Sequence, residues 1–178
     1  MLSKFEISAF LIGSIFIVLF TWYISLREKR YHGIPRFFAF EGLLFLGILQ
    51  AKVWFADPFS VRQIASWLLF IISIYYIIAS ISLYFRHNKA GINFENSTRL
   101  VTTGLYHYVR HPMYGSLLFL GWGMFLKDIN PLTIAFIILI STALFLTCKV
   151  EEKEMIGRFG EEYKKYMGVT KMWIPGIL

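Results

Sequence analysis

The chain has 178 residues, a formal net charge of +7 and 57% hydrophobic residues, but only 16% charged residues. A soluble domain carries about 25% charged residues, and here the apolar residues come in long runs, so the composition excludes an ordinary soluble domain. The basic residues lie in the connections between these runs, which is typical of membrane topology and anionic lipid headgroups rather than of a nucleic-acid partner. The single cysteine, Cys148, permits no intrachain disulfide, and no zinc-type spacing of cysteines and histidines predicts a metal site.

Five apolar segments follow one another along the chain, at residues 5–26, 37–56, 64–85, 113–126 and 132–148. The first is long enough to cross a bilayer, and no signal-peptide cleavage site follows it, so we expect a retained span. The predicted fold class is therefore all-α. We expect a polytopic membrane protein with about five transmembrane helices, a C-terminal helical hairpin and an interfacial helix.

The fourth apolar segment is short. It has about 14 residues, or roughly 21 Å of helix against a hydrocarbon core of roughly 30 Å. Because only the turn "KDIN" separates it from the fifth segment, we expect the two to form a tight hairpin inside the bundle. Gly121 and Gly123 in the fourth segment favour close packing between helices.

The basic residues predict the orientation of the chain. They are concentrated at residues 27–36, at residues 86–110 and in the tail from Lys149, whereas each of the other two connections holds one basic and one acidic residue. The positive-inside rule then puts the N-terminus outside and the C-terminus in the cytosol. We expect an integral protein of the plasma membrane in a prokaryote, or of the endoplasmic reticulum in a eukaryote.

The stretch "GLYHYVRHPMYGS", residues 104–116, combines aromatic and cationic groups at the start of the fourth segment. Pro112 suits the first position of a helix, so the free N–H groups and the positive dipole end of that helix form an anion site. The hairpin brings a glutamate pair at the end of the fifth segment level with this stretch. One cytosolic corner then gathers six polar side chains, those of Tyr106, Arg110, His111, Tyr114, Glu151 and Glu152.

This corner suits a zwitterionic ligand with an aromatic ring, such as a nucleotide-like cofactor that enters from the cytosol, because tyrosine faces and carboxylates attract a cation. The alternative is that the arginine, histidines and tyrosines only anchor the protein at lipid headgroups.

The charged tail "KVEEKEMIGRFGEEYKKYMG" has apolar residues at helical spacing, which predicts one helix. That helix is either a lid on the hairpin or a simple membrane anchor.

The motif "GLYHYVRHPMY", the hairpin and then "EEKEMIGRFGEEYKKY" resemble the membrane methyltransferases related to isoprenylcysteine carboxyl methyltransferase and to phospholipid N-methyltransferases. The resemblance covers about residues 98–168. It implies S-adenosylmethionine as methyl donor, with S-adenosylhomocysteine as product. The chain length predicts a single membrane domain over residues 1–178. We expect a three-helix scaffold part at 1–97, and the resemblance implies a cofactor-binding hairpin and tail at 98–178.

The resemblance also implies cofactor-binding residues. Leu100, Val101 and Tyr106 would line the pocket, and Glu151 would be the acidic contact. The amino-acid and adenosine parts would be held by four consecutive residues, His111, Pro112, Met113 and Tyr114. No residue is assigned as catalytic, and no metal is expected.

Two departures from the family pattern concern the acceptor. Thr98 stands where isoprenylcysteine enzymes often have histidine, and Thr147 stands where they have an arginine that grips the substrate carboxylate. The acceptor is therefore left open between an isoprenylcysteine-like carboxylate and a lipid amine or thiol, carried by a membrane lipid or a lipophilic small molecule. Alternatives are a nicotinamide-dependent membrane reductase of sterol-reductase type and a non-catalytic membrane scaffold. The sequence predicts no oligomeric state.

Overall fold

The computed structural model describes residues 3–87 and 100–177. This part of the chain folds into six α-helices and three short 3₁₀ turns, without a β-strand. The helices are α1 Lys4–Ile24, α2 Gly33–Gln50, α3 Val61–His87, α4 Pro112–Phe125, α5 Pro131–Phe159 and α6 Glu161–Val169. The 3₁₀ turns are η1 Leu26–Glu28, η2 Ala51–Val53 and η4 Gly104–His107. Thr98 lies outside the described residues.

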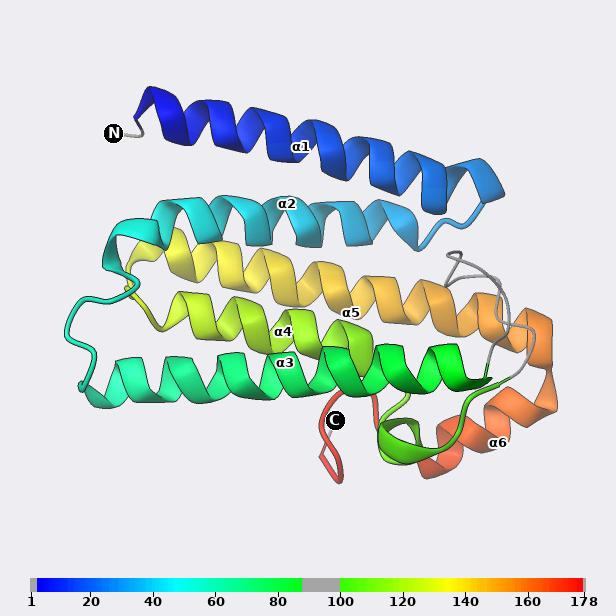
Figure 1. Ribbon diagram of the computed structural model, residues 1–178. Coiled ribbons are helices and arrows are strands. Elements are labelled where there is room, and N and C mark those ends of the chain that lie inside the picture. Colours follow the sequence, from blue (N-terminus) through cyan, green and yellow to red (C-terminus); the bar gives the residue numbers. More distant parts are fainter. Residues whose placement is uncertain (1–2, 88–99, 178) are drawn as a thin grey trace.

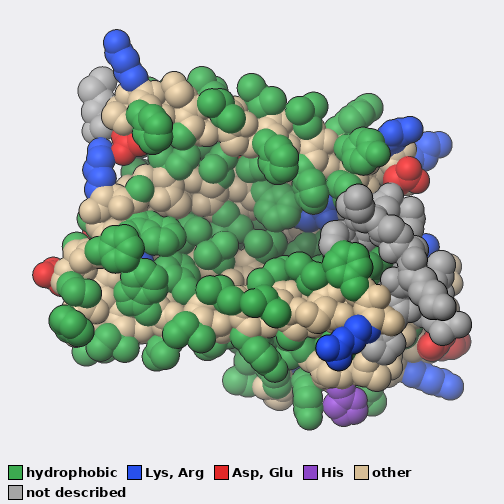
Figure 2. Space-filling view, in the orientation of Figure 1, with side chains coloured by type: hydrophobic (Ala, Val, Ile, Leu, Met, Phe, Trp, Pro, Cys, Tyr) green, Lys and Arg blue, Asp and Glu red, His purple; other side chains and the backbone are tan. Residues whose placement is uncertain are grey.

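The helices α1 to α5 run side by side, and α6 lies across one end of them (Figure 1). Four of them, α1, α2, α3 and α5, are long and apolar enough to cross a membrane. In Figure 2 hydrophobic side chains extend along the helices, while Lys, Arg, Asp and Glu gather toward the two ends. The predicted fold class, an all-α polytopic membrane protein, is confirmed. We call the end that holds η1, η4 and α6 the motif end.

The short helix α4 has 14 residues and packs against three longer helices, α2, α3 and α5. The predicted hairpin with α5 forms, but the most extensive contact of α4 is with α3. Glycines permit this approach. A Cβ atom on Gly123 would lie 2.5 Å from the ring of Phe70 in α3, and one on Gly121 would lie 3.2 Å from Leu43 in α2. The expectation of close helix packing at these two glycines is therefore confirmed.

A buried lysine closes the bundle opposite the motif end. Lys127, in the turn between α4 and α5, is only 1% exposed. Its Nζ donates a hydrogen bond of 2.8 Å to Oε1 of Gln63 and lies 3.7 Å from the centre of the Trp67 ring. Both partners belong to α3. A cation over an aromatic face is favourable when it is desolvated, so this contact fixes the turn against α3.

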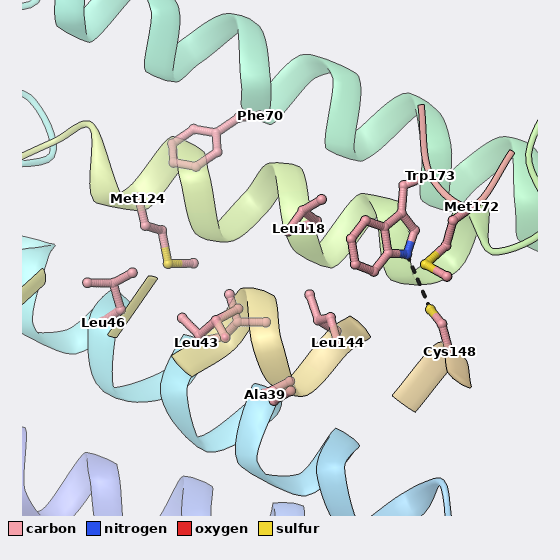
Figure 3. Packing of buried hydrophobic residues seen from close by; sticks show 12 residues of the cluster. Ala39, Leu43, Leu46, Phe70, Leu118, Met124, Leu144, Cys148, Met172 and Trp173 are labelled. Carbon is pink, nitrogen blue, oxygen red and sulfur yellow. Dashed lines mark hydrogen bonds between the residues drawn. The ribbon is translucent and has the colours of Figure 1, made fainter. Parts of the chain in front are cut away.

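The C-terminal tail takes part in the core. The core cluster joins side chains of α2, α3, α4 and α5 with Met172 and Trp173, which follow α6 (Figure 3). The predicted single helix over the charged tail is wrong, because α5 ends at Phe159 and α6 starts at Glu161. Gly160 between them has φ +57°, a value that favours glycine. The break lets α6 turn back and cover η4, where the Tyr166 hydroxyl donates to the Tyr106 carbonyl at 2.6 Å.

Candidate functional site

The start of α4 forms the centre of the motif end. His111 is the N-cap residue, with φ −124° and ψ 56°, and Pro112 takes the first helical position as predicted. The carbonyl of His111 accepts the first helical hydrogen bond, from the Gly115 N–H at 2.9 Å. The His111 side chain makes no capping hydrogen bond to this end. Within the described residues, the positive dipole end of α4 therefore lacks the usual N-cap partner.

The glutamate pair of α5 reaches the same place. The His111 imidazole lies 3.8 Å from Glu151, between Nδ1 and Oε2, and 3.5 Å from Glu152, between Nε2 and Oε1. Arg110 donates from Nε to Glu152 Oε1 at 2.6 Å. The hairpin thus brings its two ends together at the register expected from the sequence.

The two glutamates have different environments. The side chain of Glu152 is 4% exposed, and both of its oxygens are bonded, Oε1 to Arg110 and Oε2 to Lys149 at 3.1 Å. Glu151 is 24% exposed, yet its Oε2 is buried and has no hydrogen-bond partner among the described residues. Nε2 of His111 is likewise buried without one. Buried polar groups are nearly always hydrogen-bonded, so these two atoms have unused capacity for a ligand.

The charge state of His111 follows from its neighbours. Burial by itself disfavours the imidazolium. The Cys148 sulfur and the carboxylates of Glu152 and Glu151 outweigh burial and raise the pKa of His111 from 6.5 to about 10. This shift favours the imidazolium form beside the start of α4. A positive charge at the positive end of the helix dipole favours an anion there.

Tyrosines surround the carboxylates with neutral hydroxyl groups. Burial raises the pKa of Tyr106 and of Tyr163 above the ordinary value of a phenol, and the nearby charge of Glu151 adds to both shifts. The ring of Tyr114 lies 5.9 Å from that of His111, measured between centroids. The corner therefore offers a carboxylate, an imidazolium and aromatic faces within a short distance of one another.

The sequence reasoning missed the tail after α6. Residues 108–111 pair with residues 171–172 through three backbone hydrogen bonds. The N–H groups of Arg110 and His111 donate to the carbonyls of Lys171 and Met172 at 2.9 and 3.0 Å, and the Lys171 N–H donates to the Tyr108 carbonyl at 3.0 Å. The available signal was the change at Met172 from a charged tail to the apolar stretch "MWIPGIL".

Two cavities lie beside the corner, and neither is lined by His111 or Glu151. One of about 320 Å³ lies between residues 100–107 and α6, and Leu100 lines it. The other, of about 420 Å³, lies between α3 and η4. Of the remaining predicted cofactor residues, Val101 and Pro112 are buried, and Met113 is partly exposed.

Comparison with known proteins identifies the family of this fold. A sequence profile described as phospholipid methyltransferase matches residues 61–162, which is more than half of the chain. The chain belongs to the phospholipid methyltransferase family. The match includes α3, α4 and α5 and hence both His111 and Glu151. The resemblance seen in the motifs is confirmed, and it extends further toward the N-terminus than the motifs alone indicated.

Single relatives of this phospholipid methyltransferase family member match a shorter stretch. The protein-S-isoprenylcysteine O-methyltransferase of Saccharomyces cerevisiae is 34% identical over 84 residues, 47% of this chain and 35% of that protein. The methanethiol S-methyltransferase of Crocosphaera subtropica is 30% identical over 79 residues, 43% of this chain and 29% of that protein. A probable protein-S-isoprenylcysteine O-methyltransferase of Oryza sativa subsp. indica is 31% identical over 87 residues, 48% of this chain and 46% of that protein. The match therefore spans less than half the length of each of these relatives.

Proposed function

We propose that the chain is an integral membrane methyltransferase that uses S-adenosylmethionine as methyl donor. One observation carries the proposal. In the region that matches the family, Oε2 of Glu151 and Nε2 of His111 are both buried without a hydrogen-bond partner in the described part of the chain. A carboxylate beside an imidazolium at an open helix start fits the two opposite charges of an amino-acid group.

The residues have separate proposed roles. The imidazolium of His111 and the start of α4, with Pro112 and Met113, bind the carboxylate of the donor. Glu151 binds its ammonium or its ribose hydroxyl groups. Aromatic faces attract the sulfonium, a role for Tyr106 and Tyr114, and Leu100 and Val101 provide apolar lining. These assignments rest on the family motif and on charge complementarity.

S-adenosylmethionine supplies an activated methyl group when it is bound. The contribution of the protein is to align donor and acceptor and to exclude water. The tail and α6 support this by enclosing the corner, with Tyr163, Tyr166 and Trp173 all less than 9% exposed. We assign no catalytic base, because the need for one depends on whether the acceptor must lose a proton.

We propose that the acceptor enters laterally, through the cavity between α3 and η4. Its lining combines the aromatic rings of Tyr75 and Tyr108, which are 61% and 59% exposed, with the apolar Ala79 and the cation of Arg86. Such a groove suits an amphiphile that lies partly in the bilayer.

Thr147 bears on the chemical class of the acceptor. It is fully buried, and its hydroxyl donates to the Ala143 carbonyl at 2.7 Å. This position therefore supplies no cation for an acceptor carboxylate. A lipid amine or thiol is favoured over an isoprenylcysteine-like carboxylate.

Calorimetry on the detergent-purified protein tests the donor site. S-adenosylhomocysteine should bind and NADPH should not. Binding of NADPH alone would instead support a membrane reductase, and binding of neither would support a non-catalytic scaffold. The acceptor needs a second experiment, in which labelled methyl groups are transferred to a native lipid extract and the product is identified. Its polar group distinguishes amine, thiol and carboxylate acceptors.

A further inference from the structure

The segment that follows α6 lies outside the region that matches the family, which ends at residue 162. Its side chains are nevertheless buried, since Thr170, Met172 and Trp173 are each 4% exposed. A terminal segment is usually poorly ordered unless something ties it down. This segment is held by contacts with residues of the candidate site.

The backbone of the tail holds the peptide that precedes α4. The carbonyls of Lys171 and Met172 accept from the N–H groups of Arg110 and His111, which are consecutive residues. The Arg110 side chain adds a hydrogen bond of 2.9 Å from Nη1 to the Thr170 carbonyl. The tail therefore fixes both the backbone of His111 and the arginine that binds Glu152.

The side chain of Trp173 extends this support into the core. Its Nε1–H donates to Sγ of Cys148 at 3.3 Å (Figure 3). The backbone carbonyl of Trp173 accepts from the hydroxyl of Tyr76 in α3 at 3.2 Å. Cys148 is fully buried, and its sulfur is among the groups that raise the pKa of the His111 imidazole. It also precedes Glu151 by three positions, and residues at that spacing share one face of a helix.

We propose that Trp173 is a positioning residue of the candidate site. Acting through Cys148, it holds the His111 imidazole against the carboxylates of Glu151 and Glu152. The effect on ligand binding rests on the proposed function, whereas the placement of the imidazole does not. In the described part of the chain, the groups that act directly on the His111 imidazole are Tyr114, Cys148, Glu151 and Glu152. Arg110 and Tyr163 in turn face the two carboxylates.

The test substitution is Trp173→Phe, which removes the N–H donor and keeps an aromatic ring. Its matched control is Trp122→Phe in α4, where the native side chain is 42% exposed. The imidazole signals of ring-labelled histidines are recorded by NMR in detergent, and the signal of His111 is assigned by its loss in His111→Gln. We expect this signal to shift in Trp173→Phe. The affinity for S-adenosylhomocysteine should fall about three- to tenfold, as for the loss of one hydrogen bond. The control Trp122→Phe should change neither the His111 signal nor the affinity for S-adenosylhomocysteine.

A double-mutant cycle tests the route through Cys148. In a Cys148→Ala background, Trp173→Phe should have no further effect on the His111 signal. Cys148→Ser retains an acceptor for the indole N–H and should keep part of the native signal position. An unchanged His111 signal in Trp173→Phe overturns the proposal, as does an equal shift with and without Cys148. If S-adenosylhomocysteine does not bind the native protein, the proposed function fails, but the NMR result still decides the role of Trp173.

Discussion

Arg110 donates a hydrogen bond of 2.6 Å from Nε to Oε1 of Glu152, whereas no described residue donates one to the buried Oε2 of the adjacent Glu151. Two consecutive glutamates on α5 therefore have different roles. Glu152 is an internal ion-pair residue that joins α5 to the loop before α4. Glu151 keeps its acceptor capacity for a molecule from outside.

These different roles predict that substitution of Glu151 mainly affects ligand affinity and that substitution of Glu152 mainly affects thermal stability. Glu151→Gln should weaken S-adenosylhomocysteine binding at least tenfold, because a charged hydrogen bond is worth about 1.5–3 kcal/mol. It should lower thermal stability less than Glu152→Gln does, because Glu151 is partly exposed and lies 3.8 Å from His111. Glu152→Gln should lower stability by about 3 kcal/mol, since it leaves a partly buried guanidinium without its anion. Calorimetry and thermal unfolding in detergent measure the two effects, and the reverse pattern would contradict our assignment.

The protonation of His111 predicts a pH dependence of stability. In the unfolded chain the imidazole has an ordinary pKa of about 6.5, whereas in the folded chain its pKa is about 10. The folded state therefore binds the proton more tightly, and the stabilisation is complete below pH 6.5 and is lost as the pH rises toward 10.

We expect the midpoint of thermal unfolding to decrease between about pH 6.5 and 10 for this reason. His111→Gln should be less stable than the native protein at pH 6.5, and the difference should diminish toward pH 10. The matched control is His107→Gln, because the His107 side chain is exposed. A His111→Gln variant with the same pH slope as the native protein would show that the imidazole is not held as a cation.

The sequence predicts much of this arrangement because helix geometry fixes register. A proline at the start of α4 and a five-residue connection to α5 suffice to bring His111 opposite the glutamate pair. The division between Glu151 and Glu152 could not be predicted, since neighbouring residues on a helix differ by about 100° in direction. Only the packed structure shows which of them faces Arg110.

The end of α5 at Gly160 and the packing of the tail after α6 were not predicted from the sequence, for physical reasons. The helical periodicity of the charged tail continues through Gly160, so the pattern gave no sign that its positive φ ends α5 there. The apolar stretch that begins at Met172 indicates burial, but it does not indicate against which helices these residues pack. Their place in the core depends on long-range contacts, namely the backbone bonds to the peptide before α4 and the packing against side chains of α4 and α5.

The buried Lys127 predicts a stability effect far from the candidate site. Lys127→Met removes the ammonium and leaves Oε1 of the fully buried Gln63 without its donor. An unsatisfied buried acceptor costs about 1–3 kcal/mol, so the unfolding midpoint should fall. The control is Lys52→Met, because the Lys52 side chain is 70% exposed, and its pair with Glu6 contributes little. S-adenosylhomocysteine affinity should stay within about twofold in both variants, and a large loss in Lys127→Met would mean that the two ends of the bundle are coupled.

The cavity between α3 and η4 predicts a variant that separates acceptor from donor binding. Ala79 lines this cavity, and Ala79→Trp should fill part of its volume of about 420 Å³. Methyl transfer to a lipid extract should then fall at least fivefold, while S-adenosylhomocysteine affinity is unchanged, because the site at His111 lies outside this cavity.

Ala65→Trp is the matched control, since Ala65 lies about four turns earlier on nearly the same face of α3 and does not line the cavity. If both variants retain full transfer, the acceptor enters elsewhere. If Ala79→Trp also loses cofactor affinity, the cavity is part of the donor site and not a separate entrance.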